Sequence, residues 1–169
     1  GGIGGGNTPG GGIGSKPLPP EPGYIDTING GAGNDTIHAA LTGVGGYTIA
    51  NGGDGDDIIN GGNGNDQLFG GAGEDTISGG RGNDVIFGGA DSDQLTGGAG
   101  MDIILGEDGD DWIYGDTTSD SGIDYLIGGN GEDRIYGGVS GAYIDGGAGD
   151  DYIQASAGYI TAYAGEGND

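Results

Sequence analysis

A nine-residue repeat runs through most of this chain and constrains its fold more than any other feature. From Gly52 the pattern G-G-x-G-x-D-x-U-x, in which U is a large aliphatic residue, recurs for seven successive copies up to Tyr114. Further copies occupy residues 30–38, 128–136 and 146–154. A short repeat at a fixed period predicts a solenoid, in which each unit is one structural element stacked on its neighbours.

The two halves of the repeat predict different local structures. The six-residue G-G-x-G-x-D half predicts a tight turn, because glycine can adopt positive φ and leaves the backbone bare. The x-U-x half predicts a short strand whose alternation buries only the U side chain. The predicted core is therefore one line of aliphatic residues: Ile59, Leu68, Ile77, Ile86, Leu95, Ile104, Ile113, Leu126, Ile135, Ile144 and Ile153.

The turn half also predicts a metal site. Its bare backbone can direct carbonyl oxygens at a cation, and the aspartate adds a hard anionic oxygen. Oxygen ligands without His, Cys or Met favour calcium over zinc or copper. The predicted metal ligands are Asp35, Gly52, Gly53, Gly55, Asp57, Gly61, Gly64, Asp66, Gly70, Gly73, Asp75, Gly79, Gly82, Asp84, Gly88, Asp93, Gly97, Gly100, Asp102, Gly109, Asp111, Asp124, Gly128, Gly131, Asp133, Gly146, Gly149 and Asp151.

From residue 24 to its end, the chain resembles the RTX (repeats-in-toxin) family, whose haemolysin-type nonapeptide repeats bind calcium. The resemblance implies an all-β fold, a right-handed parallel β-roll (β-solenoid). In such a roll two repeats complete one coil, and calcium ions lie between stacked turns. It also implies secretion from a bacterium, with folding delayed until the chain meets extracellular calcium.

If two repeats complete a coil, the sixth-position residues sort into two rows. One row runs through Asp57, Asp75, Asp93, Asp111, Asp133, Asp151 and Asp169. The other runs through Asp66, Asp84, Asp102 and Asp124 and then loses its carboxylates at Ala142 and Ile160. One ion between each pair of stacked turns gives five sites from Asp57 to Asp151 and three from Asp66 to Asp124. The expected cofactor is therefore calcium, about eight ions.

Three segments interrupt the repeat. Residues 39–51 hold Tyr47-Thr48-Ile49 where a strand led by aspartate is expected. Residues 115–127 carry four extra residues, which predict a bulging loop at 117–120. Residues 137–145 lack the aspartate. We expect these segments to protrude from the roll or to leave gaps in its calcium rows.

The outward strand positions predict a roll with two different faces. Val85, Phe87, Ile103 and Leu105 fall on one sheet, whose predicted outer face is nearly all apolar. An exposed apolar stripe of this kind is typical of an interface. It indicates self-association or a surface protein as partner, although the N-terminal segment or a missing domain could cover it instead. Trp112 and the tyrosines could contact a sugar, but their outward strand positions favour packing on the sheet.

The amino-acid composition argues against several classes of binding partner. The 169 residues include 49 Gly, 27 acidic and 3 basic residues, and the formal net charge is −24. This acidity argues against nucleic acid and anionic membranes as partners, and no apolar run is long enough for membrane insertion. Without calcium, such a chain is expected to be disordered.

The sequence divides into two regions. Residues 1–23 are expected to be a Gly/Pro-rich linker before the roll at 24–169, and the chain is interpreted as a processed product or a fragment.

No catalytic constellation is visible. There is no Cys and a single His, so neither a Cys-His nor a Ser-His-Asp arrangement is expected, and the chain is predicted not to be an enzyme.

The first functional hypothesis is a structural, surface-assembly or adhesive module, at the cell surface or secreted, that forms filaments or layers. The alternative is the accessory region of a secreted toxin or hydrolase whose catalytic domain lies elsewhere. A weaker hypothesis is ice binding, for which only Thr76 and Thr96 stand on the second sheet.

Overall fold

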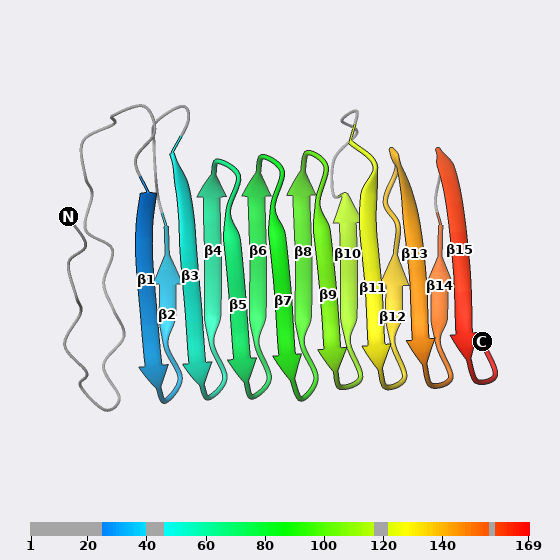
Figure 1. Cartoon of the computed structure of the whole chain (residues 1–169), viewed down its shortest axis with the longest axis horizontal. Helices are drawn as coiled ribbons and strands as arrows, with labels where there is room; N and C mark the ends of the chain where they lie inside the picture. Colours follow the sequence, from blue (N-terminus) through cyan, green and yellow to red (C-terminus); the bar gives the residue numbers. More distant parts are fainter. Residues whose placement is uncertain (1–24, 40–45, 117–121, 156–157) are drawn as a thin grey trace.

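The computed structural model shows a parallel β-solenoid and describes residues 25–39, 46–116, 122–155 and 158–169 (Figure 1). The predicted linker at 1–23 and the predicted loop at 117–120 lie outside these ranges. All strand pairs in these ranges are parallel, which confirms the predicted β-roll. No helical segment there has the length and apolar character that a membrane crossing needs.

Successive strands alternate between two sheets, so that two strands complete one coil. The eight-stranded sheet contains β1 (Ile25–Ala32), β3 (Tyr47–Asp54), β5 (Gln67–Ala72), β7 (Val85–Ala90), β9 (Ile103–Asp108), β11 (Asp124–Asn130), β13 (Gly141–Ala148) and β15 (Tyr159–Glu166). The seven-stranded sheet contains β2 (Thr36–His38), β4 (Ile58–Asn63), β6 (Thr76–Arg81), β8 (Gln94–Ala99), β10 (Trp112–Asp116), β12 (Arg134–Tyr136) and β14 (Tyr152–Gln154).

Most strands are longer than the three residues that the repeat predicts. A typical strand such as β5 has six residues, and it continues through the two glycines that open the next repeat. Gly71 of β5 pairs in register with Gly53 of β3 and with Gly89 of β7. The predicted strands were too short because the two glycines were assigned wholly to the turn. Their backbones instead extend the parallel ladder before the chain bends.

The core is the predicted single line of aliphatic side chains between the two sheets. Ten of the eleven predicted positions are at most 2% exposed, and Ile37 and Ala50 continue the line towards β1. Ala50 takes the place of a large aliphatic residue and pairs with Leu68. Ile153 is only half-buried, because β14 is the edge strand of the seven-stranded sheet. A core this thin needs another source of stability along the roll.

The turns line the two long edges of the roll, and only one edge is regular (Figure 1). The regular edge holds the turns that lead from odd-numbered to even-numbered strands, and each has three residues between its strands. The connections of other lengths all fall on the opposite, irregular edge: they are β2–β3, β10–β11 and β12–β13, where the three interruptions lie, and also β14–β15. The extra residues therefore leave the strands in register and the regular edge intact.

Candidate metal centre

A ladder of buried carboxylates follows the regular edge. The backbone N–H of Asp57 donates to Oδ1 of Asp75 at 2.7 Å, and the N–H of Asp75 donates in turn to Oδ1 of Asp93 at 2.8 Å. The same bond links each sixth-position residue to the one in the next coil, from Asp35 to Asp169, through Asp57, Asp75, Asp93, Asp111, Asp133 and Asp151. The longer of the two predicted rows is therefore a continuous structural feature.

A shorter ladder follows the irregular edge. It runs from Asp66 to Asp124 through Asp84 and Asp102, with N–H to Oδ1 distances of 2.8–3.0 Å. The bond between Asp102 and Asp124 spans 22 residues instead of 18, so the four extra residues do not break the ladder. Beyond Asp124 the row continues in register to Ala142 and Ile160, which have no carboxylate. The predicted loss of the second row is confirmed.

The structure adds one residue to this row that the repeat pattern did not identify. Thr48, fully buried on β3, occupies the sixth-position slot, and its N–H donates to Oδ1 of Asp66 at 2.6 Å. The spacing of 18 residues before Asp66 is the signal that could have found it. The segment Tyr47-Thr48-Ile49 is therefore a regular part of the coil, and it does not interrupt the ladder.

The second oxygen of these carboxylates has a different environment. The ladder aspartates from Asp35 to Asp151 are at most 6% exposed. Their Oδ2 atoms are buried without any hydrogen-bond donor among the described residues at Asp35, Asp57, Asp66, Asp75, Asp84, Asp93, Asp111, Asp133 and Asp151. A buried anionic oxygen without a partner is strongly unfavourable. These oxygens need either a proton or a cation.

The first glycine of each repeat leaves room beside that oxygen. A Cβ added at Gly61 would lie 2.6 Å from Oδ2 of Asp66 and 2.7 Å from the carbonyl oxygen of Gly79, its counterpart one coil further on. The space is therefore lined by a carboxylate oxygen and a carbonyl oxygen, which are the ligands that calcium prefers. A Cβ would likewise meet the aspartate Oδ2 of the same repeat at Gly52, Gly70, Gly79, Gly88, Gly97, Gly128 and Gly146.

The other predicted glycines serve the backbone path. Gly73 has a φ of 116°, and a Cβ there would lie 2.6 Å from the carbonyl group of Gly55 in the preceding coil. A side chain at Gly73 would therefore clash with the backbone of the preceding coil. The same positive φ occurs at Gly53, Gly55, Gly64, Gly82, Gly100, Gly109, Gly131 and Gly149. The assignment of these glycines as ligands, through their carbonyl oxygens, stays a prediction.

The sequence matches the family model for the RTX calcium-binding nonapeptide repeat (4 copies) at residues 23–41, 51–86, 69–104, 87–121, 118–140 and 145–169. The chain belongs to this RTX family. Its repeats are calcium-binding, and the structure is the calcium-binding β-roll that they imply. No curated protein and no solved structure gives a significant match to the chain.

The residues of this RTX roll fit calcium. The orphaned Oδ2 atoms and the glycine carbonyl oxygens of stacked turns form a set of hard ligands, and calcium bound there would neutralise the buried carboxylates and join consecutive coils. Within the described ranges, no three His, Cys, Asp or Glu side chains converge on one point. In the predicted calcium sites, the ligands would instead be carboxylates of consecutive turns together with backbone carbonyl oxygens.

Burial gives these carboxyls an unusual affinity for protons. Burial, together with neighbouring ladder carboxylates, raises the pKa of Asp93 to about 8 and that of Asp84 to about 7, despite the opposing backbone hydrogen bonds. Burial raises the pKa of Asp75, Asp111 and Asp133 to about 6. At neutral pH, several of these groups are therefore poised between a bound proton and the negative charge that would attract calcium.

The metal-free chain is expected to gain sheet structure on acidification. The folded state has the raised pKa values, so it binds more protons than the unfolded state, in which an aspartate titrates near pH 4. The resulting stabilisation is complete below about pH 4 and is lost as the pH rises through about 6–8. Circular dichroism of calcium-free protein between pH 8 and pH 4 checks this. Sheet content that does not change over that range would contradict it.

A second, outer ladder was not foreseen. Fifth-position side chains accept hydrogen bonds in the opposite direction, from the N–H one coil further on. Oδ1 of Asp56 accepts from Glu74 at 3.1 Å, and Oδ1 of Asn83 accepts from Met101 at 3.0 Å. The Asp and Asn residues that precede the ligand aspartate in the sequence are the signal from which this outer ladder could have been predicted.

Asp116, which replaces the second glycine of its repeat, is also buried and was not predicted.

Proposed function

We propose that this RTX roll is a structural module that folds on calcium outside the cell and then self-associates. The proposal rests on one surface, the outer face of the eight-stranded sheet. We call it the apolar face and define it by Val85, Phe87, Ile103, Leu105, Tyr125 and Ile127. In this proposal the chain contributes to a surface layer, filament or adhesin and catalyses no reaction.

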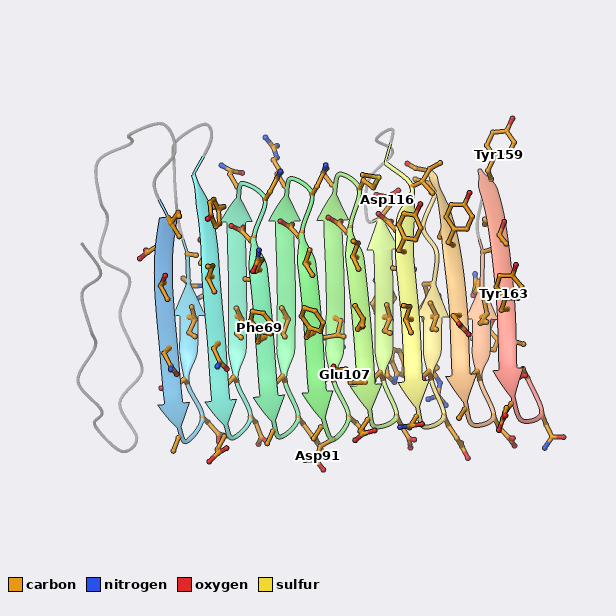
Figure 2. The ribbon with its side chains drawn as sticks, in the orientation of Figure 1. Phe69, Asp91, Glu107, Asp116, Tyr159 and Tyr163 are labelled. Carbon is orange, nitrogen blue, oxygen red and sulfur yellow. The ribbon has the colours of Figure 1, made fainter. Side chains whose placement is uncertain are left out.

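The apolar face is continuous across three adjacent strands. Val85 pairs with Ile103, and Ile103 with Tyr125, while Phe87 pairs with Leu105 and Leu105 with Ile127. The side chains point away from the core, and Ile103, Tyr125 and Ile127 are 39–44% exposed. Ring stacking extends the surface at both ends, with centroids 5.0 Å apart for Phe69 with Phe87 and for Tyr125 with Tyr143. Figure 2 views the roll from this side, with Phe69 labelled.

Charge favours a second copy as the occupant. From β5 to β11, the seventh and ninth positions of the repeat carry no charge on this sheet, in a chain with 27 acidic residues, and the one outward carboxylate on these strands is Glu107, towards the end of β9. A surface that binds a basic partner would carry several carboxylates, but in this roll the rows of carboxylates lie along the two turn edges. Two copies can bury their apolar faces together, provided that calcium first reduces the repulsion between the acidic edges. Association should therefore depend on calcium.

Charging the apolar face is expected to abolish association without unfolding the roll. The test variant is Val85→Asp with Phe87→Asp, whose side chains point outward from β7. The matched control is Thr76→Asp with Ser78→Asp, at the equivalent outward positions of β6 on the other sheet. Light scattering coupled to size exclusion, in millimolar calcium, should give a monomer for the test variant and the assembled species for the control and the unmodified chain.

Two results would count against this proposal. If the test variant is folded by circular dichroism and assembles as before, the apolar face is not the interface. If the unmodified chain is monomeric at high protein and calcium concentration, self-association is wrong. That second outcome would favour the other candidate function, an accessory region that helps a secreted toxin or hydrolase to fold outside the cell.

A further inference from the structure

The seven-stranded sheet carries a group of aromatic side chains on its outer face, at its C-terminal end. We call it the aromatic platform and define it by Trp112, Tyr114, Arg134, Tyr136 and Tyr152. Its members stand at the outward positions of β10, β12 and β14. Trp112, Arg134 and Tyr152 lie in register across these strands, and Tyr114 pairs with Tyr136 in the parallel line.

The rings are ordered against one another and yet remain accessible. Tyr114 and Tyr136 are stacked, with centroids 4.8 Å apart and planes 5° from parallel. The guanidinium carbon of Arg134 lies 5.4 Å from the centre of the Trp112 ring. Trp112 is 41% exposed and Tyr152 is 53% exposed. Packing of rings on the sheet, as the sequence suggested, therefore leaves a large part of the two outermost rings open to solvent.

Around the platform, the seventh and ninth positions of the repeat carry no acidic residue, and Asp116, the carboxylate at the end of β10, is buried. At these positions, β6, β8, β10, β12 and β14 carry Thr76, Ser78, Gln94, Thr96, Trp112, Tyr114, Arg134, Tyr136, Tyr152 and Gln154. None is acidic, although the chain has 27 acidic residues and only 3 basic ones, of which Arg134 is one. The platform therefore combines exposed rings with hydroxyl, amide and guanidinium groups.

This combination differs from that of the apolar face. The apolar face has hydrocarbon at nearly every outward position, which suits a dry contact with a second copy. The platform instead places donors and acceptors beside its rings, as at Tyr152, whose hydroxyl donates to Oε1 of Gln154 at 3.1 Å. Apolar surface with convergent polar groups is typical of small-molecule and polymer recognition. Exposed tyrosine and tryptophan rings provide such contacts at little cost in conformational entropy.

We infer that the aromatic platform binds an uncharged, extended polysaccharide. The apolar face of a sugar ring would stack on Trp112 and on Tyr152, which lie two strand spacings apart, about 9–10 Å. The sugar hydroxyls would meet Arg134, Gln154 and the tyrosine hydroxyls. The two exposed rings lie in one line across parallel strands, so they suit an extended β-1,4-linked chain better than a coiled α-linked one. The acidic turn edges disfavour anionic polymers.

Native electrophoresis through gels that contain hydroxyethylcellulose tests this inference. In millimolar calcium, the unmodified chain should be retarded relative to a gel without the polymer. The variant Trp112→Ala with Tyr152→Ala should lose most of this retardation, with affinity reduced about tenfold or more. The matched control is Ile103→Ala with Tyr143→Ala, which removes two exposed outward side chains from the other sheet and should remain retarded.

Fluorescence supplies a second measurement on the unmodified protein. Trp112 is the one tryptophan of the chain, so its emission should shift saturably on titration with cellohexaose and much less with maltohexaose. The inference is overturned if hydroxyethylcellulose does not retard the unmodified chain or if Trp112 emission does not respond to cellohexaose. It is also overturned if the folded platform variant is retarded as strongly as the control, or if carboxymethylcellulose binds more tightly than the neutral polymer.

Discussion

Removing calcium is expected to convert the roll into a largely unfolded chain. The folded state buries two rows of carboxylates whose Oδ2 atoms have no protein donor at nine of the described positions. It also brings together a chain of net charge −24 around a core one aliphatic side chain wide. Near neutral pH neither the core nor the strand ladder offsets this repulsion. Folding and calcium binding should therefore be a single event.

Circular dichroism and small-angle scattering measure this transition directly. Adding EGTA to the calcium-loaded protein at pH 8 should remove the sheet signal. The radius of gyration should approach about 40 Å, the value for an unfolded chain of this length. Returning millimolar calcium should restore the roll. Magnesium at the same concentration is the control and should restore little, because it demands a tighter octahedral geometry. Equal sheet content with and without calcium would refute the central role of the two rows.

Neutralising one carboxylate in the middle of the long row is expected to have the second largest effect. Asp93 is 2% exposed, its Oδ1 accepts the N–H of Asp75, and its Oδ2 has no donor among the described residues. The variant Asp93→Asn keeps an acceptor for Asp75 but replaces the other oxygen by an NH₂ group. Calcium would then face a donor instead of an anionic ligand. We expect a loss of stability on the order of 3–5 kcal/mol and fewer bound ions.

The matched control for this variant lies two residues away. Asp91→Asn removes the same charge from an exposed residue in the same turn, at the regular edge shown in Figure 2. Asp91 has a φ of 74°, a conformation that asparagine also tolerates, so the control should fold normally. Calcium titrations followed by circular dichroism should give a midpoint several-fold higher for Asp93→Asn only. Similar midpoints for both variants would show that net charge matters and the ladder position does not.

Periodicity, together with the resemblance to RTX repeats, predicted the plan of this fold. A nine-residue period with one aliphatic residue predicts stacking around a thin core, the resemblance added the parallel two-repeat coil, and Leu68, Ile86 and Ile104 lie where that plan places them. The phase of the repeat separated the aspartates into a long and a short row, since residues 18 apart must occupy equivalent positions in a two-repeat coil. The loss of the second row after Asp124 follows from the same count. Such local, repeated constraints can be read without knowledge of distant contacts.

Other features depended on contacts between coils, which the repeat does not encode. The pattern of Tyr47-Thr48-Ile49 departs from the consensus, and its stacking on β5 shows that Thr48 continues the ladder. The sequence predicted the glycines as bends and as sources of carbonyl ligands. The structure adds that the first glycine of a repeat, such as Gly61, also keeps a space open beside Oδ2 of Asp66.

The sequence by itself determined that this chain is a calcium-binding roll and how its carboxylates are phased. The tertiary structure decided what each edge and face presents. It placed every irregular connection on one edge, which leaves the other ladder continuous from Asp35 to Asp169. It also brought Trp112, Arg134 and Tyr152 into one line across three strands. Residues 18 or 22 positions apart become neighbours only when coils stack, and the register of that stacking is set by hydrogen bonds between coils.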